Sequence, residues 1–386
     1  MSSDGTSTSP PHDPEGQQPQ SQQGQYPPPG GYPHAGVPYP GYPPYSYGYG
    51  WGWGRPPAPQ PGIIALRPMN LGDLINGAFA AVRANPAVML GMTAVVVVIS
   101  QIVTFLAQTP LTRVSTGSHS DNDPAEIFTS LAASVGASMG VSLVTTVATV
   151  VLTGMLTVVV AHSVLGEKIS AGAAWGALKP RALPLLGLVL IQLLIAVIPL
   201  LVLIAGVIVL VAAGGWVTAA VLGFVGFVLL IVLYVAVMPT FALATPALVL
   251  ERRGPIDALR RSLAMQRVGY WRLLGILLLV YLVVGIIASV IVVPFSVGSA
   301  LSTVNDAGQF TVARTTVAGL ALTGVGTAIA QIITMPFTSS VQTLLYADQR
   351  MRSEGFEQVL QGEAMRRMQG APAVPSDELW VAPRVY

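Results

Sequence analysis

The sequence predicts an all-α integral membrane protein with six transmembrane helices, organised as three repeats of an interfacial helix followed by a helical hairpin. Hydrophobic residues make up 52% of the 386-residue chain and charged residues 9%, whereas soluble domains carry about 25% charged residues. Six apolar runs contain no Asp, Glu, Lys or Arg, and each reaches the roughly 20 residues that cross a bilayer core. Seventeen of the 19 Lys and Arg residues lie in the tails or on alternate connections between the runs.

The six predicted spans follow one another with short or moderate connections. They cover residues 87–107, 131–165, 182–213, 216–250, 273–293 and 315–346. The third and fourth meet at Gly214 and Gly215, and together they are far too long for one crossing of about 20 residues. The positive-inside rule places both termini and the basic connections in the cytoplasm, so we expect a multi-pass protein of the cell membrane. Arg113 and Arg314 are the two exceptions to this pattern.

The chain divides into three parts by composition. Residues 1–62 form a Pro/Gly/Tyr-rich segment with too few aliphatic residues for a core, and we expect a disordered cytoplasmic tail. Residues 63–347 form the membrane domain, and residues 348–386 form a cytoplasmic segment with a helix around 348–369. The N-terminal tail is interpreted either as a solvated tether or as a segment that recruits a protein partner.

Three similar segments precede the first, third and fifth spans, at residues 71–91, 169–187 and 254–275. In the first, apolar residues recur at helical spacing from Leu71 to Val82, which indicates an amphipathic helix lying in the membrane interface. In the third, Ile256, Leu259, Leu263 and Val268 are predicted to line one side of a similar helix, with the charged residues largely elsewhere.

The second span of each pair also ends in a similar window. Residues 154–167, 238–251 and 335–348 have equal length, and each window ends in an acidic residue. Internal repeats are common in transporters, where the binding site lies between them. Duplication of a stable two-helix unit leaves the same pattern, so both interpretations remain open.

Little of the sequence points to catalysis, and we predict no enzymatic activity, cofactor, metal site or nucleic-acid partner. There is no cysteine, and the four histidines lack the spacing of a metal site. No P-loop, dinucleotide-binding turn or nucleophile elbow occurs. The spans contain a few polar residues, among them Gln101, Gln192 and Gln331. Such residues either form hydrogen bonds between helices or line a site between the repeats.

The basic segment 251–272 is the main candidate for function. Its six arginines are predicted to contact anionic lipid: Arg252, Arg253, Arg260, Arg261, Arg267 and Arg272. Cations next to the membrane gain about 1 kcal/mol each near anionic headgroups. The alternative is that these arginines serve only to set the topology.

Three segments resemble parts of the membrane domain of the glycerophosphoryl diester phosphodiesterase type: residues 66–91, residues 248–280 and LLYADQRMRSEGFE at residues 344–357. The likeness spans about residues 66–360, and the tail resembles those of many actinobacterial membrane proteins. In that architecture the membrane domain is joined to a catalytic barrel of about 250 residues, for which this chain leaves no room. The resemblance therefore implies a membrane module without its own catalytic residues.

Three functions follow as hypotheses. The first is a non-enzymatic scaffold or lipid-associated module with a basic interfacial helix that contacts anionic lipid. The second is a transporter or lipid-translocating protein with a site between the repeats, which requires a polar cavity at mid-membrane depth. The third is the membrane subunit of a phosphodiesterase whose catalytic part is on another chain.

Overall fold

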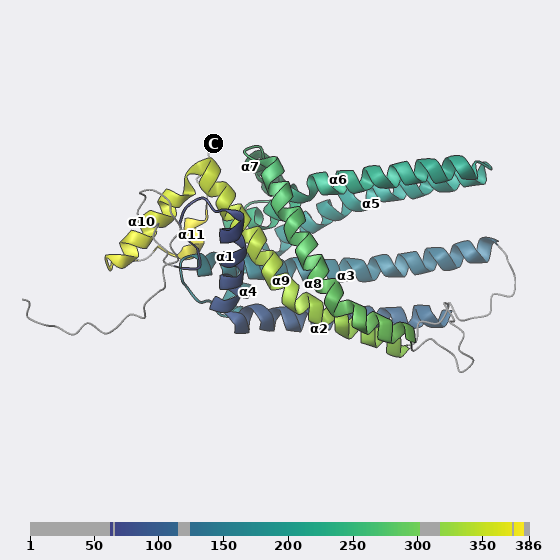
Figure 1. Cartoon of the computed structure of the whole chain (residues 1–386), viewed down its shortest axis with the longest axis horizontal. Helices are drawn as coiled ribbons and strands as arrows, with labels where there is room; N and C mark the ends of the chain where they lie inside the picture. Colours follow the sequence, from purple (N-terminus) through teal and green to yellow (C-terminus); the bar gives the residue numbers. More distant parts are fainter. Residues whose placement is uncertain (1–61, 65, 115–123, 302–316, 373, 382–386) are drawn as a thin grey trace, which may run out of the picture. The chain divides into compact units, whose positions relative to one another are not determined.

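The structure is a computed structural model that describes residues 62–64, 66–114, 124–301, 317–372 and 374–381, and this part is helical without strands (Figure 1). Nearly all of the predicted N-terminal tail, and much of the connections predicted at 108–130 and 294–314, lie outside the described residues. The helices are α1 (Leu71–Ala84), α2 (Pro86–Val114), α3 (Pro124–Val164), α4 (Ala171–Leu178), α5 (Ala182–Ala212), α6 (Trp216–Glu251), α7 (Pro255–Gln266), α8 (Tyr270–Leu301), α9 (Val317–Glu354), α10 (Phe356–Met368) and α11 (Ser376–Leu379), with a 3₁₀ turn at Lys179–Arg181.

Six helical segments in the described part are long and apolar enough to cross a membrane, which confirms the predicted number of spans. They lie on α2, α3, α5, α6, α8 and α9. As expected, the even-numbered spans are long: α3 has 41 residues, α6 has 36 and α9 has 38. The C-terminal helix expected around 348–369 is instead divided between α9 and α10, because the backbone at Gly355 adopts a left-handed conformation that ends α9.

A short helix precedes each odd-numbered span, as the three similar segments predicted. The starts of α1, α4 and α7 follow from local sequence: Asn70 forms a capping box with Asp73, Ser170 accepts a hydrogen bond from Ala173 N, and Pro255 occupies the first turn of α7. We call the end of the bundle that carries α1, α4, α7 and α10 the tail side. The threefold repeat itself stays a prediction.

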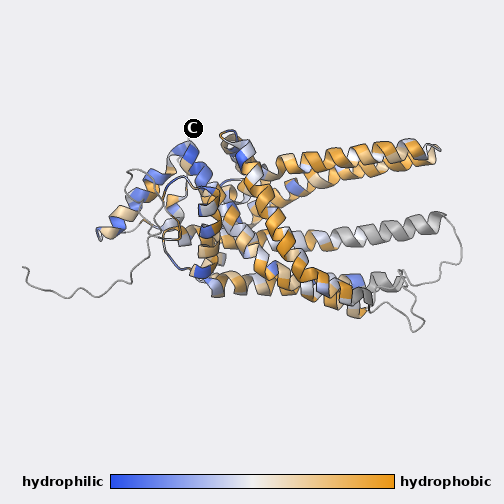
Figure 2. Ribbon diagram, viewed as in Figure 1, coloured by the Kyte–Doolittle hydropathy of each residue, from blue (hydrophilic) through white to orange (hydrophobic). Residues whose placement is uncertain are grey.

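The core lies at the tail side, where the final turns of α3, α6 and α9 pack together. From Pro239 to Glu251, every residue of α6 except Phe241 is buried, and α9 is buried from Ser339 to Met351 except at Gln342. These two stretches overlap the second and third of the similar windows, 238–251 and 335–348. Beyond them, α5 and α6 expose large apolar side chains on most sides, as expected where helices face lipid. Figure 2 shows hydrophilic residues gathered at the tail side and apolar residues along the long helices.

The segment 62–70 threads across the tail side before α1 begins. Ile63 N donates to Ser163 O (3.3 Å), and Met69 N donates to Asp348 Oδ1 (2.7 Å). A Cβ added at Gly62 would lie 2.3 Å from Val164 O and 2.5 Å from Gly166 N, so only glycine fits there. The side chains of Ile64, Leu66 and Met69 are buried in the core. The first residues of the membrane domain are therefore part of its packing.

Candidate functional site

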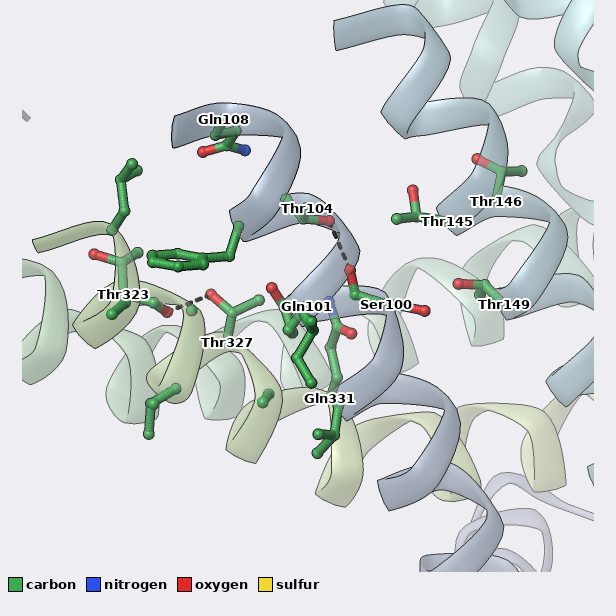
Figure 3. Close-up of a pocket in the computed structure, with 18 of the residues that line it drawn as sticks. Ser100, Gln101, Thr104, Gln108, Thr145, Thr146, Thr149, Thr323, Thr327 and Gln331 are labelled. Carbon is green, nitrogen blue, oxygen red and sulfur yellow. Dashed lines mark hydrogen bonds between the residues drawn. The ribbon is translucent and has the colours of Figure 1, made fainter. Parts of the chain in front are cut away.

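A cavity of about 720 Å³ lies between α2, α3 and α9 (Figure 3). Ten of its 19 lining residues carry a hydroxyl or amide side chain, and none of the 19 is charged. The ten are Ser100, Gln101, Thr104, Gln108, Thr145, Thr146, Thr149, Thr323, Thr327 and Gln331. The rest of the lining is apolar, including Phe105, Leu320 and Val325. The cavity thus has the mixed character of a small-molecule site, with polar groups set among apolar walls.

The cavity lies at membrane depth. At about 1.5 Å rise per residue, Gln101 lies about 22 Å along α2 from Pro86, where the first span begins. Thr149 lies about 22 Å from Val164 at the tail-side end of α3, and Gln331 about 26 Å from Asp348 on α9. A bilayer core is about 30 Å thick. The three helices therefore bring their polar residues together within the candidate spans and beyond the tail-side core.

Two of the three lining glutamines, Gln101 and Gln331, differ in their hydrogen bonding from three of the threonines. Thr104 donates to Ser100 O (2.8 Å), Thr145 to Val141 O (3.0 Å) and Thr327 to Thr323 O (2.9 Å), each within its own helix. In the described part of the chain, the amides of Gln101 and Gln331 have no hydrogen-bond partner. Gly324 leaves room for one of them, because a Cβ added there would lie 4.0 Å from Gln101 Oε1. Gln101 and Gln331 thus present unpaired amide groups to the cavity, which Gln108 also lines.

The structure brings together two of the three glutamines that the sequence singled out. Gln101 and Gln331 line the same cavity, on α2 and α9, whereas Gln192 lies on α5 and is not part of the lining. Thr104 and Thr323 also stood out in the sequence as polar residues within spans, whereas five other hydroxyl residues of the lining did not: Ser100, Thr145, Thr146, Thr149 and Thr327. Their signal was the clustering of Thr145, Thr146 and Thr149 within one turn of an otherwise apolar span.

The six arginines of 251–272 divide into two groups. Arg253, Arg261 and Arg272 form ion pairs with buried carboxylates, and contact of all six arginines with anionic lipid stays a prediction. Arg252, Arg260 and Arg267 are exposed, and no ion pair to another described residue engages them. A carboxylate that is removed from water requires a charged partner. Three of the six arginines therefore neutralise carboxylates in the core of the protein.

Glu251, at the end of α6, is the centre of the larger charged cluster. Its side chain has no exposed surface, and it pairs with Arg253 (2.5 Å) and Arg261 (3.0 Å). The buried hydroxyl of Tyr346 on α9 also donates to it. Arg261 and Arg350 both pair with Glu354, and Arg350 donates to Trp380 O (2.8 Å). This cluster links α6, α7, α9 and the C-terminal segment.

Asp348 on α9 is the centre of the second cluster. Its carboxylate is fully buried and pairs with Arg272 (2.7 Å) and Arg352 (3.0 Å). It also accepts the hydrogen bond from Met69 N, while both arginines donate to Met69 O. One carboxylate and two arginines therefore satisfy both backbone groups of a buried residue in the segment 62–70.

Glu167, after α3, holds the C-terminal segment. It pairs with Arg367 (2.8 Å) and accepts a hydrogen bond from Ser376 (2.6 Å). Burial alone would raise the pKa of the Glu363 carboxyl, but hydrogen bonds from Arg367 and Val374 N outweigh burial and hold this pKa below its usual value. The acidic residues that end the three similar windows, Glu167, Glu251 and Asp348, thus each bind arginine.

The exposed face of α7 carries arginines as well as apolar residues that were predicted to line one side. The apolar residues Ile256, Leu263 and Val268 point outward, and the buried face carries Ala258, Ser262, Met265 and Gln266. Ser262 donates to Thr240 O (2.6 Å), so small and polar side chains make the contact with α6. Ile256, Arg260, Leu263 and Arg267 follow the spacing i, i+4, i+7, i+11 along one exposed stripe. We call these four residues the α7 stripe.

The comparisons with known proteins identify a family but no function. The family model described as "Domain of unknown function (DUF7847)" matches residues 69–347. No significant match was found among curated proteins or among solved structures. The resemblance to the phosphodiesterase membrane domain stays a prediction. Because the matched residues make up most of the chain and include all six candidate spans up to the tail side of α9, the protein belongs to the DUF7847 family.

Proposed function

We propose that this protein binds an amphipathic molecule from the bilayer in the cavity between α2, α3 and α9, as a lipid-binding or lipid-translocating membrane protein. The observation that carries the proposal is the pair of amides, Gln101 and Gln331, that face this cavity at membrane depth without a partner in the described protein. An unpaired amide in an apolar environment costs several kcal/mol. A bound molecule with hydrogen-bonding groups removes that cost.

The arrangement supports binding over simple helix packing. If polar residues only joined helices, their side chains would bond across the helix contacts. Such bonds occur nearer the tail side, where Ser339 on α9 donates to Thr153 O on α3 (3.4 Å). At the cavity, by contrast, the hydroxyls of Thr104, Thr145 and Thr327 bond within their own helices, and the amides of Gln101 and Gln331 face open space. The cavity also lies between the first predicted hairpin and the last helix of the third, which is where repeat transporters place their sites.

The test compares lipid retained by two matched glutamine variants. Protein extracted with its native lipids is analysed by native mass spectrometry. We expect Gln101→Leu/Gln331→Leu to reduce the occupancy of the co-purified amphiphile about tenfold or more, equivalent to about 1.4 kcal/mol. Gln192→Leu makes the same chemical change outside the cavity and should leave occupancy unchanged. Equal lipid occupancy in all three proteins would contradict the proposal.

A second variant distinguishes loss of lipid binding from loss of folding in the double mutant. Ala328→Phe places a ring in the cavity without removing a polar group. It should also lower lipid occupancy, while an unchanged elution profile on size exclusion shows that the bundle is intact.

A scaffold or lipid-associated module is the second candidate function, and the α7 stripe favours it. Arg260 and Arg267 alternate with Ile256 and Leu263 on one exposed face beside the membrane-spanning helices. Apolar side chains inserted at the interface with arginines at headgroup level are typical of an interfacial helix. In this proposal the tail side is cytoplasmic, the lipids that contact the α7 stripe are anionic, and the N-terminal tail recruits a partner protein.

The structure sharpens the test of this second candidate. Arg252→Gln/Arg260→Gln/Arg267→Gln removes exposed charge without breaking an ion pair, unlike changes at Arg253 or Arg261. We expect weaker binding of phosphatidylglycerol added to detergent-solubilised protein, counted by native mass spectrometry. The control is Arg366→Gln on α10, another exposed arginine. If both variants bind phosphatidylglycerol like the wild type, the stripe is not a lipid contact.

We propose that the chain itself is not an enzyme. The third function, a membrane subunit of a phosphodiesterase with its catalytic part on another chain, rests only on the sequence resemblance. Phosphodiesterase activity in the purified single chain would overturn the non-enzymatic assignment.

A further inference from the structure

We infer that the cavity is a one-sided site: it is closed toward the tail side, opens toward the opposite half of the membrane, and takes the uncharged polar headgroup of an amphiphile. This inference rests on the proposed function and adds the route of access and the class of ligand. Its evidence is the packing below the cavity and the chemistry of the lining.

The packing between the cavity and the tail side is tight. On α2, Met89, Thr93 and Val97 are buried, directly before the first lining residue, Val98. On α3, burial resumes at Leu152, just after the last lining residue, Val150. On α2 and α3 the cavity lining therefore gives way to protein core within two residues, and on α9 near-continuous burial resumes at Ser339.

Hydrogen bonds join α3 to α9 at this level. Ser339 Oγ donates to Thr153 O (3.4 Å), and one turn further Thr343 Oγ1 donates to Thr157 Oγ1 (3.4 Å). Ser339, Thr343 and Thr157 are buried. These small side chains let the two backbones approach closely, as small polar residues do between membrane helices. A polar ligand has no path between α3 and α9 toward the tail side.

A second closure lies beyond this contact. The segment 62–70 crosses the helix ends, with Leu66 and Met69 buried and Met69 held on both backbone groups by Asp348, Arg272 and Arg352. Leu66 O accepts a further hydrogen bond from Gln361 (2.6 Å). Passage through the tail side would require the breaking of this whole arrangement. The cavity is thus a pocket rather than a segment of a channel.

The lining selects the headgroup. The ten polar side chains offer hydroxyl and amide groups, which donate and accept hydrogen bonds with neutral partners. A charged headgroup would lack a counter-ion among the 19 lining residues, and an unpaired charge at membrane depth is costly. A headgroup that carries hydroxyls or amides satisfies both Gln101 and Gln331, while its apolar chain contacts the apolar wall.

Cysteine labelling tests the sidedness, because the natural chain has no cysteine. Thr327→Cys places a thiol in the cavity, Ala264→Cys marks the tail-side surface of α7, and Ala213→Cys marks the α5–α6 turn on the opposite side. Each variant is reconstituted in vesicles and exposed to a charged, membrane-impermeant thiosulfonate from one side at a time. We expect Thr327→Cys to react from the side that labels Ala213→Cys and not from the side that labels Ala264→Cys. Reaction from the Ala264→Cys side, or from neither side, overturns the one-sided cavity.

Protection from labelling tests the headgroup. Octyl glucoside and octyl sulfate have the same chain and differ in headgroup charge. Below its micellar concentration, octyl glucoside should slow the labelling of Thr327→Cys several-fold, and octyl sulfate should not. Equal protection by the sulfate overturns the neutral headgroup. If neither compound protects while one-sided labelling holds, the binding function fails and the access route stands, so the two failures are distinguishable.

Discussion

The two halves of α6 differ in environment although both are apolar. From Trp216 to Met238 the helix exposes large side chains such as Phe224, Leu229 and Val232. From Pro239 to Glu251 it is almost completely enclosed by protein. The enclosed half is richer in small and polar residues, with Thr240, Thr245 and two prolines. Lipid chains are as apolar as leucine, so apolar character alone does not show which half of a membrane helix packs against protein. Small and polar residues do show it.

The same contrast separates the whole tail side from the membrane-level half. The tail side is held by buried ion pairs and a close-packed core, whereas the membrane-level half exposes apolar side chains and encloses a cavity. Substitutions of one residue type should therefore have large effects on the tail side and small effects elsewhere.

The largest expected effect is at Asp348. Asp348→Ala leaves Arg272, Arg352 and Met69 N without their shared partner, and the loss of one member of such a cluster costs about 3–5 kcal/mol. We expect this loss in the free energy of unfolding, measured by SDS titration in mixed micelles. Asp257→Ala, at the exposed start of α7, should cost less than about 1 kcal/mol. Equal losses for the two variants would contradict the distinction.

The next effect compares two leucines. Leu344 is fully buried on the tail side, and Leu344→Ala should cost about 3 kcal/mol through lost contacts and a residual void. Leu229 is 62% exposed on α6, so Leu229→Ala should cost less than about 1 kcal/mol, since lipid or detergent replaces the lost contact. The same SDS titration measures both. A large cost at Leu229 would indicate that protein, not lipid, covers that surface.

Two glycine-to-alanine substitutions are expected to change the stability of the protein in opposite directions. A Cβ at Gly77 would lie 2.8 Å from Ile64 Cγ2 and 2.9 Å from Leu344 Cδ1, so Gly77→Ala should destabilise by about 1–3 kcal/mol. At Gly275 on α8 a Cβ would meet no atom within 4 Å, and Gly275→Ala should stabilise by up to about 1 kcal/mol through helix propensity. The midpoint of thermal unfolding in detergent should move down for the first variant and up for the second.

The smallest effect is a pH dependence of the C-terminal segment. Because the pKa of Glu363 is lower in the folded protein than in the unfolded chain, its contribution is present above the unfolded pKa and is lost as pH falls through the folded pKa. The protection of residues 374–381 from backbone hydrogen exchange, measured relative to the intrinsic exchange rate at each pH, should therefore decrease as the pH becomes acidic. Glu363→Gln should remove this acid-dependent loss of protection. If the variant shows the same pH profile as the wild type, another titratable group is responsible for the loss.

Much of the fold was predictable because apolar length and the placement of charge are local properties of the sequence. These properties predicted six spans, the long even-numbered helices and the short helices α1, α4 and α7. The exposed face of α7 was predicted only in part, because Arg260 and Arg267 lie on the same stripe as Ile256 and Leu263 instead of elsewhere on the helix. The pairing of Arg253, Arg261 and Arg272 was also hidden, since their partners Glu251 and Asp348 lie on α6 and α9.

The site was predictable only in part. Gln101 and Gln331 stood out as amides inside apolar spans, and the cavity contains both. Gln192 stood out equally, but its helix does not reach the cavity. Which polar residues converge depends on how α2, α3 and α9 pack, and a single sequence carries no direct signal of that packing.

The hydrogen bond from Met69 to Asp348 joins residues 279 positions apart. Met69, near the start of the membrane domain, therefore meets this partner only after the last span has been synthesised. Until then, Met69 N lacks its acceptor and Arg272 lacks its carboxylate, although Ser163 on α3 is already present to accept from Ile63 N. The tail-side core is therefore completed only by the end of α9, and a chain that stops before Asp348 would leave Met69 and Arg272 without this partner.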